Sequence, residues 1–205
     1  MPSSVSTVVF DVGNVLIEWD PNHLYRKLIP DAEQRDDFLT NICSMDWNLE
    51  QDLGRTWEEA VEILSSQHPE HTDLIAAYSA RWHEMVPGEI HGSVKILAEL
   101  QSANVPLYAI TNFSSEKFAE ARNRFPFLQT SFIDTVVSAE ERIIKPDQRI
   151  YEVLLSRNNL TAADCVFIDD SATNVEAARR VGMTALHFVG PDELRLDLRN
   201  LGLPL

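Results

Sequence analysis

The second half of the chain alternates short apolar runs with helical patterns, and this rhythm restricts the possible folds more than any other feature. Apolar runs that suit buried strands occupy residues 105–110, 133–137, 166–168 and 184–189. Helical patterns lie between them over residues 115–124, 148–155 and 172–181, the last of which stops at Gly182. Strands that alternate with helices at this spacing form βαβ units with right-handed crossovers, so we predict a parallel sheet.

A further strand-like run lies near the amino terminus, where Val8, Val9 and Phe10 precede Asp11 and Gly13. Its β-branched and aromatic residues are typical of a strand that is buried on both faces. Taken alone, Asp11 is most simply the acid of an Asp-x-Gly turn. However, the carboxyl end of such a strand is where open α/β sheets bind ligands, and an aspartate held there can act as a covalent nucleophile or a metal ligand.

Residues 17–87 contain no convincing parallel-sheet strand and carry a succession of helical patterns instead. Apolar residues recur at helical spacing around residues 24–29, 38–42, 60–64 and 72–85, and Thr56 with Glu59 predicts a capping box before the third segment. Pro87 and Gly88 mark the return to the α/β rhythm. We therefore predict an α/β core from residues 1–16 and 88–205, with a small helical lobe inserted at residues 17–87.

The charge balance limits the partners of the chain. Lysine and arginine total 17 against 32 aspartate and glutamate residues, which gives a formal net charge of -15 over 205 residues. A surface that binds nucleic acid backbones is therefore improbable. An anionic substrate would require local compensation by a lysine, a divalent cation or helix amino termini, because the overall field is repulsive.

Cysteine usage and hydropathy favour a soluble, cytoplasmic protein with no membrane partner. The two cysteines, Cys43 and Cys165, lie far apart in no metal-ligand spacing, which suits a reducing cytosol. The first six residues lack the pattern of a signal peptide, and no apolar run approaches the ~20 residues that a membrane span requires.

Polar side chains follow three of the predicted strands: Asp11, then Thr111 with Asn112, then Asp169 with Asp170. Parallel strands end at one edge of a sheet, so we expect these groups to converge although the chain separates them. Two successive acids at a buried strand end require compensation, and with Asp11 they offer oxygen ligands suited to Mg²⁺. The alternative for the pair is a helix amino-terminal cap with the serine that follows.

Other residues could contact a substrate at this edge. Lys145 precedes Pro146 and a predicted helix; beside an acidic site, it could bind an anionic group and offset the repulsion from the carboxylates. The four tryptophans all lie before residue 88, and most of them suit packing in a small lobe. Trp19 is the exception that we assign to substrate contact, because it is close in sequence to Asp11.

Together these residues resemble the four motifs of the haloacid dehalogenase (HAD) superfamily: Asp11 with Gly13 and Asn14, Thr111, Lys145 with Pro146, and Asp169 with Asp170. The resemblance covers nearly the whole chain, and it includes a helical cap inserted after the first motif. It implies a Rossmann-like core with a cap and a hydrolase activity. In such a site, Asp11 attacks as nucleophile, Thr111 hydrogen-bonds the transferred group and Lys145 orients nucleophile and substrate. Mg²⁺ would be bound by Asp11, Asp169, Asp170 and the carbonyl of Gly13.

Gly13 departs from the family pattern. Phosphatases of this family usually carry a second aspartate at this position as general acid and base, and the dehalogenases usually carry an aromatic residue. A subgroup with Asp-x-Gly-Asn-Val in the first motif is similar to this chain and includes sugar-phosphate phosphatases. The proton for the leaving group must then come from elsewhere, and we consider Glu18, Asp20 or a metal-held water.

Three functions are open at this stage. We favour a Mg²⁺-dependent phosphatase of a small phosphorylated metabolite, because Asp169 and Asp170 indicate a metal and the related dehalogenases work without one. The second is a 2-haloacid dehalogenase, in which Asn112 would bind halide and Arg26 a carboxylate. The third is a binding or regulatory protein that keeps the fold with little catalysis. The sequence specifies neither the substrate nor the oligomeric state.

Overall fold

The computed structural model describes residues 5–205, and its core is one five-stranded parallel sheet. The strands lie in the order β3-β2-β1-β4-β5, so β1 is central, and each neighbouring pair is parallel. Their bounds are β1 (Thr7–Phe10), β2 (Leu107–Thr111), β3 (Asp134–Val137), β4 (Cys165–Asp169) and β5 (Thr184–His187). The predicted α/β fold with a parallel sheet is thus confirmed.

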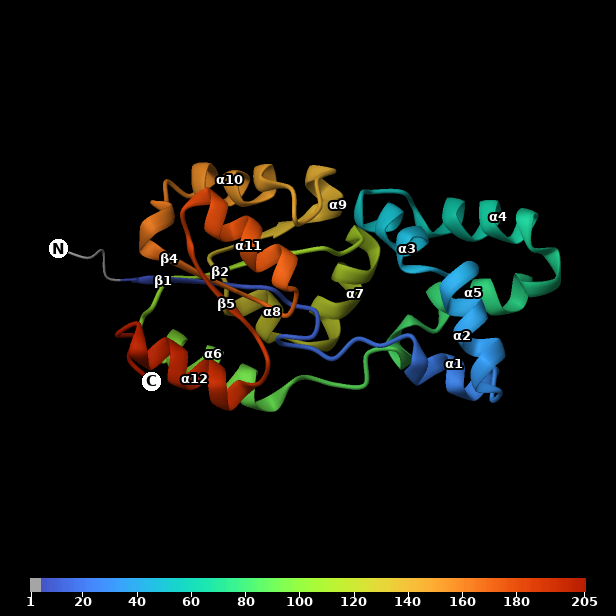
Figure 1. The fold of residues 1–205 in the computed structure, drawn as a ribbon, viewed down its shortest axis with the longest axis horizontal. Coiled ribbons are helices and arrows are strands. Elements are labelled where there is room, and N and C mark those ends of the chain that lie inside the picture. Colours follow the sequence, from blue (N-terminus) through green and yellow to red (C-terminus); the bar gives the residue numbers. More distant parts are fainter. Residues whose placement is uncertain (1–4) are drawn as a thin grey trace.

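Helices cover both faces of the sheet, which explains why its strands read as uninterrupted apolar runs. Val8 and Phe10 of β1 pack with Leu97 on one face, whereas Val9 packs with Ile150 on the other. Figure 1 shows these two helical layers above and below the strands. The first layer contains α6 (His91–Ser102) and α12 (Pro191–Asn200), and the second contains α10 (Gln148–Arg157) and α11 (Ala172–Val181).

Local capping signals fix where several core helices begin and end. The hydroxyl of Ser114 accepts the Lys117 N–H at the start of α7 (Ser115–Arg124). Gly182 ends α11 at φ 96°, a left-handed conformation that favours glycine. Both helices have the predicted bounds, and the predicted helix over residues 148–155 extends to Arg157. Two short helices complete the core, α8 (Phe127–Thr130) and α9 (Ser138–Glu141).

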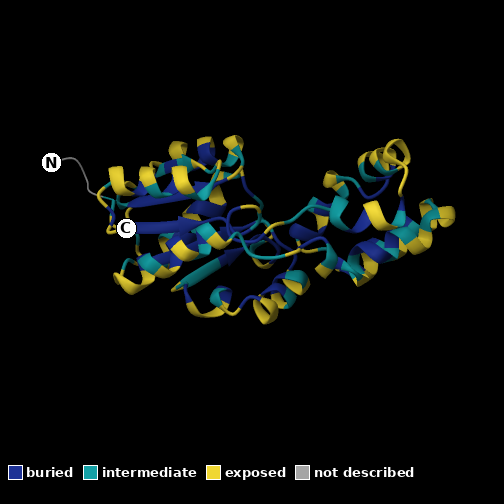
Figure 2. Cartoon of the chain, turned by 90° about the horizontal axis from the view of Figure 1, so that it is seen from below, coloured by how far each residue is buried: buried dark blue, intermediate teal, exposed yellow. Residues whose placement is uncertain are grey.

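The inserted segment forms a helical lobe at one end of the sheet (Figures 1 and 2), and we call it the cap. Its centre is aromatic: the Tyr78 ring lies 5.5 Å from that of Trp57 and 6.0 Å from that of Tyr25. The predicted capping box of Thr56 and Glu59 is confirmed. The helices are α1 (Asn22–Leu28), α2 (Ala32–Asn41), α3 (Met45–Asp52), α4 (Trp57–Gln67) and α5 (Thr72–Ala80), with 3-10 turns at Pro69–His71 and Trp82–Glu84.

The helix that we predicted over residues 72–85 is shorter in the structure. It ends at Ala80, and a 3-10 turn follows in which Arg81 Nε donates to Glu84 Oε1 at 2.6 Å. Trp82, in that turn, is buried with its ring centroid 5.7 Å from that of Phe113 in the core. Helical periodicity continues through residue 85 because these side chains are buried by contact with the core, which the pattern alone does not distinguish from a longer helix.

Two crossing segments join the cap to the core. Ile17 forms an isolated antiparallel bridge with Glu89, and the Ile90 N–H donates to Leu16 O at 2.8 Å. We predicted a core of residues 1–16 and 88–205 and a cap of residues 17–87. This division stays a prediction, and both of its boundaries fall within the two crossing segments.

Residues 5–205 include no helix with the length and apolar character that a membrane crossing demands. Cys43 and Cys165 are both buried and form no disulfide.

Candidate active site

The polar groups that follow the strands gather at one edge of the sheet. Asp11 follows β1, Thr111 ends β2 on one side of it, and Asp169 ends β4 on the other. Carboxylate oxygens of Asp11, Asp169 and Asp170 lie within 4.8 Å of one another. Parallel pairing therefore brings together residues that are up to 159 positions apart in the chain, by the difference between 170 and 11.

Lys145 lies between two of these carboxylates. Its Nζ is 2.8 Å from Asp11 Oδ1 and 2.7 Å from Asp169 Oδ2, and it also donates to the main-chain oxygen of Ile110. The Lys145 side chain is almost completely buried. Both ends of the Asn112 amide hold the main chain of this residue: Oδ1 accepts the Lys145 N–H at 2.8 Å, and Nδ2 donates to Lys145 O at 3.0 Å. Asn112 thus positions the loop that carries Lys145.

Asp169 is fully buried and accepts hydrogen bonds from several donors. Besides Lys145, these are the Ser171 N–H at 2.8 Å and Asn174 Nδ2, which lies 3.0 Å and 3.1 Å from the two oxygens. The Ser171 side chain does not cap α11. Asn174 was missed in the sequence, where its only signal is its place in the first turn of the helix that follows Asp170.

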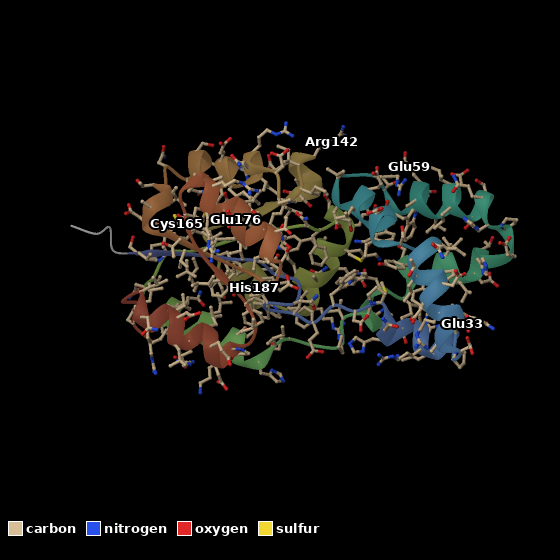
Figure 3. All side chains as sticks on the ribbon, in the orientation of Figure 1. Glu33, Glu59, Arg142, Cys165, Glu176 and His187 are labelled. Carbon is tan, nitrogen blue, oxygen red and sulfur yellow. The ribbon has the colours of Figure 1, made fainter. Side chains whose placement is uncertain are left out.

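Asp170 is more exposed than its neighbour and keeps contact with the loop after β1. Partial desolvation and the charge of Asp169 raise its pKa, while Lys145 and a hydrogen bond from the Asn14 side chain lower it. Its main-chain oxygen lies 2.9 Å from Nε2 of His187, a residue labelled in Figure 3. Asn14 has φ 54°, a left-handed conformation that asparagine tolerates, and its Oδ1 accepts the Trp19 N–H.

The charges of this cluster do not balance. Three carboxylates face one ammonium group, so two negative charges remain. Burial raises the pKa of Asp11 to about 7, Lys145 opposes this rise, and the neighbouring acids add to it. Burial also acts against the Lys145 charge, but Asp11 and Asp169 outweigh it and raise the Lys145 pKa. A hard divalent cation fits this donor set, because it prefers carboxylate oxygens and supplies the two missing positive charges.

Thr111 presents a hydroxyl that the protein leaves unused. The residue is buried, and its Oγ1 has no hydrogen-bond partner among residues 5–205. An unsatisfied buried hydroxyl costs roughly 1–3 kcal/mol. The hydroxyl at the end of β2 is therefore available to a bound polar group.

A cavity of about 180 Å³ lies between the cap and this edge of the sheet, and its surface is mostly apolar. Trp19, which we assign to substrate contact from the sequence, contributes to its lining. The buried Trp57 and Trp82, for which we favoured packing, line it as well. A larger hollow of about 550 Å³ beside α6 contains no residue of the site. The cavity lining is Gly13, Trp19, Met45, Asn48, Leu49, Asp52, Trp57, Trp82, Asn112, Phe113, Ser114 and Lys117.

Of the site residues proposed from the sequence, Gly13, Trp19 and Asn112 line the cavity. The residues outside its lining are Asp11, Thr111, Lys145, Asp169, Asp170, Glu18, Asp20 and Arg26. Glu18 is exposed, and Asp20 Oδ1 accepts the Asn22 N–H at 2.8 Å, which holds the start of α1. Arg26 is exposed on α1. The acid–base roles of Glu18 and Asp20 stay predictions.

Asp52 is a buried acid in the cavity lining that sequence reasoning missed. It is the last residue of α3, a helix that we did not predict. The only signal near it is Gly54, at φ 104°, which marks the end of a helix without indicating the direction of its last side chain.

Comparison with known proteins identifies the family. The model of the haloacid dehalogenase-like hydrolases matches residues 5–182, which is most of the chain. The chain belongs to this family and is a HAD-like hydrolase. It is 27% identical over 204 residues to the sesquiterpene phosphatase astK of Aspergillus oryzae, which covers 98% of both chains. It is also 28% identical over 116 residues to flavin mononucleotide hydrolase 1 of Arabidopsis thaliana, which covers 56% of this chain and 46% of the relative.

Solved structures show the same fold. A HAD family enzyme of Bacteroides thetaiotaomicron, in complex with magnesium and inorganic phosphate, aligns with TM-score 0.70 and 20% identity over 89% of this chain and 93% of that one. The L-2-haloacid dehalogenase of Xanthobacter autotrophicus aligns with TM-score 0.62 and 16% identity over 98% and 85%. The shared fold does not by itself identify the reaction, so the residues of the site must do so.

Proposed function

We propose that this HAD-like hydrolase is a Mg²⁺-dependent phosphatase that acts on a small phosphorylated metabolite through an aspartyl-phosphate at Asp11. The acidic cluster carries this proposal. Asp11, Asp169 and Asp170 hold two more negative charges than Lys145 balances, and their oxygens are close enough to share one cation. Displacement of halide needs no such cation, whereas phosphoryl transfer gathers charge that a cation neutralises.

The side chains of the site have distinct roles in this reaction. Lys145 orients the Asp11 carboxylate and faces the incoming anion, which offsets the repulsion of a protein with net charge -15. Thr111 donates its unused hydroxyl to a phosphate oxygen. Asp11, Asp169, Asp170 and the Gly13 carbonyl are the residues that would hold Mg²⁺. When bound, the ion supplies positive charge to the phosphate oxygens.

The cavity favours substrates whose organic part is apolar or aromatic. Indole and phenyl rings of Trp19, Trp57, Trp82 and Phe113 form much of its lining. The names of two relatives, a sesquiterpene phosphatase and a flavin mononucleotide hydrolase, agree with this chemistry. A sugar phosphate, which the first motif suggested, would meet the polar side chains of Asn48, Asp52 and Lys117 in the same lining.

A panel of substrates tests the proposed function. The purified chain is assayed with p-nitrophenyl phosphate, a prenyl monophosphate, flavin mononucleotide and hexose phosphates, each with Mg²⁺ and with a chelator. We expect phosphate release that depends on Mg²⁺ and is fastest for an apolar or aromatic substrate. Chloroacetate with a chelator is the comparison, and chloride release there would support the dehalogenase instead. Mg²⁺-dependent binding of phosphate without turnover on any substrate would support a binding protein.

A small anionic substrate, rather than nucleic acid or a membrane, is the partner that we propose. The net charge of -15 argues against nucleic acid. The cytoplasmic location expected from the cysteines also stays a prediction.

A further inference from the structure

We propose that Asp52 of the cap donates the proton to the leaving oxygen of the substrate, the task for which Gly13 provides no side chain. This inference rests on the phosphatase function proposed above. By this proposal the cap contributes a side chain to the reaction itself and does not only contact the substrate.

Hydrogen bonds fix Asp52 at the junction of cap and core. Its main-chain oxygen accepts the Ser138 hydroxyl at 2.7 Å, and the Phe113 N–H donates to the same hydroxyl at 2.9 Å. The Asp52 carboxylate accepts the Ser114 N–H at the start of α7. Asn48 Nδ2 lies 3.4 Å from its Oδ2, which is at the long limit of a hydrogen bond. Residues after β2 and β3 therefore hold this acid in a fixed position relative to the catalytic edge.

The cavity places Asp52 in the same space as the position that lacks an acid. Both Gly13 and Asp52 line it, and so does Asn112, whose amide holds the loop that carries Lys145. The Lys145 charge lowers the pKa of Asp52, against the larger effect of burial. A phosphate bound between Asp11 and Thr111 would lie next to this cavity, because Gly13 and Asn112, which line it, follow these two residues closely in the chain.

The environment of Asp52 suits an acid that gives up and regains a proton. Burial raises its pKa to about 7, and the Ser114 N–H and Lys145 lower it. Other titratable groups lie around this region: Arg142 is beside Gly54, and Glu116 accepts the Trp57 N–H at 3.1 Å. Tyr78 is a buried phenol, and the Lys117 ammonium is bound to Ser79 O at 2.8 Å and to Glu120. A carboxyl with a pKa near neutral pH can act as both general acid and general base.

The proton transfers balance over the two steps. In the first step an Asp11 oxygen bonds to phosphorus, the bond from phosphorus to the leaving oxygen breaks, and the Asp52 proton moves to that oxygen. The products are an alcohol, the aspartyl-phosphate and the Asp52 carboxylate. In the second step water attacks phosphorus and gives a proton to Asp52. The bond from phosphorus to Asp11 then breaks, which releases inorganic phosphate and restores both side chains.

The dependence on the leaving group tests this role. Asp52→Asn keeps an oxygen that can accept the Ser114 N–H but cannot supply the proton. We compare kcat/KM, which reports the first step, because the second step uses Asp52 in the same way for every substrate. We expect kcat/KM to fall about 10²- to 10⁴-fold for an alkyl phosphate, which needs protonation, and to change little for p-nitrophenyl phosphate. Glu50→Gln, an exposed change on the same helix, is the matched control. An equal loss for both substrates, or no loss for either, would overturn the proposal.

A second variant asks whether the lost function is proton donation. An added Cβ at Gly13 meets no atom within 4 Å, so Gly13→Asp can be accommodated. The double variant Asp52→Asn with Gly13→Asp should recover at least part of the alkyl phosphatase rate. A double variant as slow as Asp52→Asn alone on the alkyl phosphate would contradict a proton-donor role.

The pH profile of the unmodified protein provides a measurement that does not depend on how the variants fold. With an alkyl phosphate, kcat/KM should decline above pH 7, because the protonated form of Asp52, which the first step needs, is lost as pH rises through its pKa. The kcat/KM for p-nitrophenyl phosphate should show a smaller decline, and the same decline for both substrates counts against Asp52. If the unmodified protein hydrolyses neither substrate with Mg²⁺, the phosphatase function itself fails.

Discussion

The edge of the sheet and the face of the cap meet at one cavity, but different physics positions their side chains. At the edge, Asp11, Thr111 and Asp169 converge because parallel pairing fixes the ends of neighbouring strands. On the cap, Asp52 and Trp57 reach the cavity because of how aromatic side chains pack and how α3 docks. Backbone geometry determines the first region, and side-chain packing determines the second.

The difference extends to polar chemistry. Each carboxylate at the edge has a charged or hydrogen-bonding partner within the cluster, and Lys145 links two of them. On the cap, Asp52 has no ion-pair partner among residues 5–205, and its side-chain donor, Asn48 Nδ2, is 3.4 Å from its Oδ2. Burial raises the pKa of both Asp11 and Asp52 to about 7, but only Asp11 is paired directly with an ammonium group. The edge thus combines several charges, whereas the cap presents a single carboxyl.

Removing the Lys145 ammonium group from the edge of the sheet should have the largest effect on activity and stability. Lys145→Met leaves Asp11 and Asp169 without their shared partner, and breaking a buried ion pair typically costs about 3–5 kcal/mol. We expect turnover to be lost and the free energy of unfolding to fall by about 3 kcal/mol in a chelator. Chemical denaturation with and without Mg²⁺ measures this.

The exposed Lys95→Met provides the control for that experiment. Added Mg²⁺ should stabilise Lys145→Met more than the unmodified protein, because the cation replaces part of the missing positive charge. Full stability and activity of Lys145→Met in a chelator would show that Lys145 does not organise this edge.

A smaller and more selective effect is expected at Thr111. Thr111→Val keeps the shape of the side chain and removes a hydroxyl that bonds to nothing among residues 5–205. The free energy of unfolding should therefore stay unchanged or rise by up to about 1–3 kcal/mol, because the variant no longer buries an unpaired hydroxyl. The value of kcat/KM should fall by about 10²-fold, the usual effect of losing one donor to a transition-state oxygen.

Thr184→Val, at the start of β5 and away from the catalytic edge, is the matched variant. Steady-state kinetics and thermal unfolding distinguish the outcomes. If Thr111→Val lowers stability but leaves kcat/KM unchanged, the hydroxyl stabilises the fold. In that case Thr111 does not bind the anionic substrate.

Sequence reasoning succeeded where local signals and strand pairing determine the structure. Gly182 ends α11, the Thr56 capping box begins α4, and parallel pairing brings Asp11 near Asp169. The sequence predictions were wrong where the contact between cap and core determines which residues are buried. The pattern over residues 72–85 continues beyond Ala80, because the residues after it are buried by the core rather than by their own helix.

Residues that act through tertiary contacts were also missed. Asn174 holds Asp169 from the first turn of α11, and Asp52 reaches the cavity from a short helix with little amphipathic pattern. Gly13 indicated that an acid was absent but not where a replacement would come from. The position of any replacement acid depends on how the cap lies on the sheet, which a one-dimensional pattern does not encode.

The central claim, that Asp11 carries the phosphoryl group, can be tested by acid-quenching the enzyme during turnover with Mg²⁺ and locating the modified peptide by mass spectrometry. We predict one phosphoryl group on the peptide that contains Asp11, with neither that adduct nor turnover in Asp11→Asn. Turnover that survives in Asp11→Asn, or a phosphoryl group on another residue, would contradict the account.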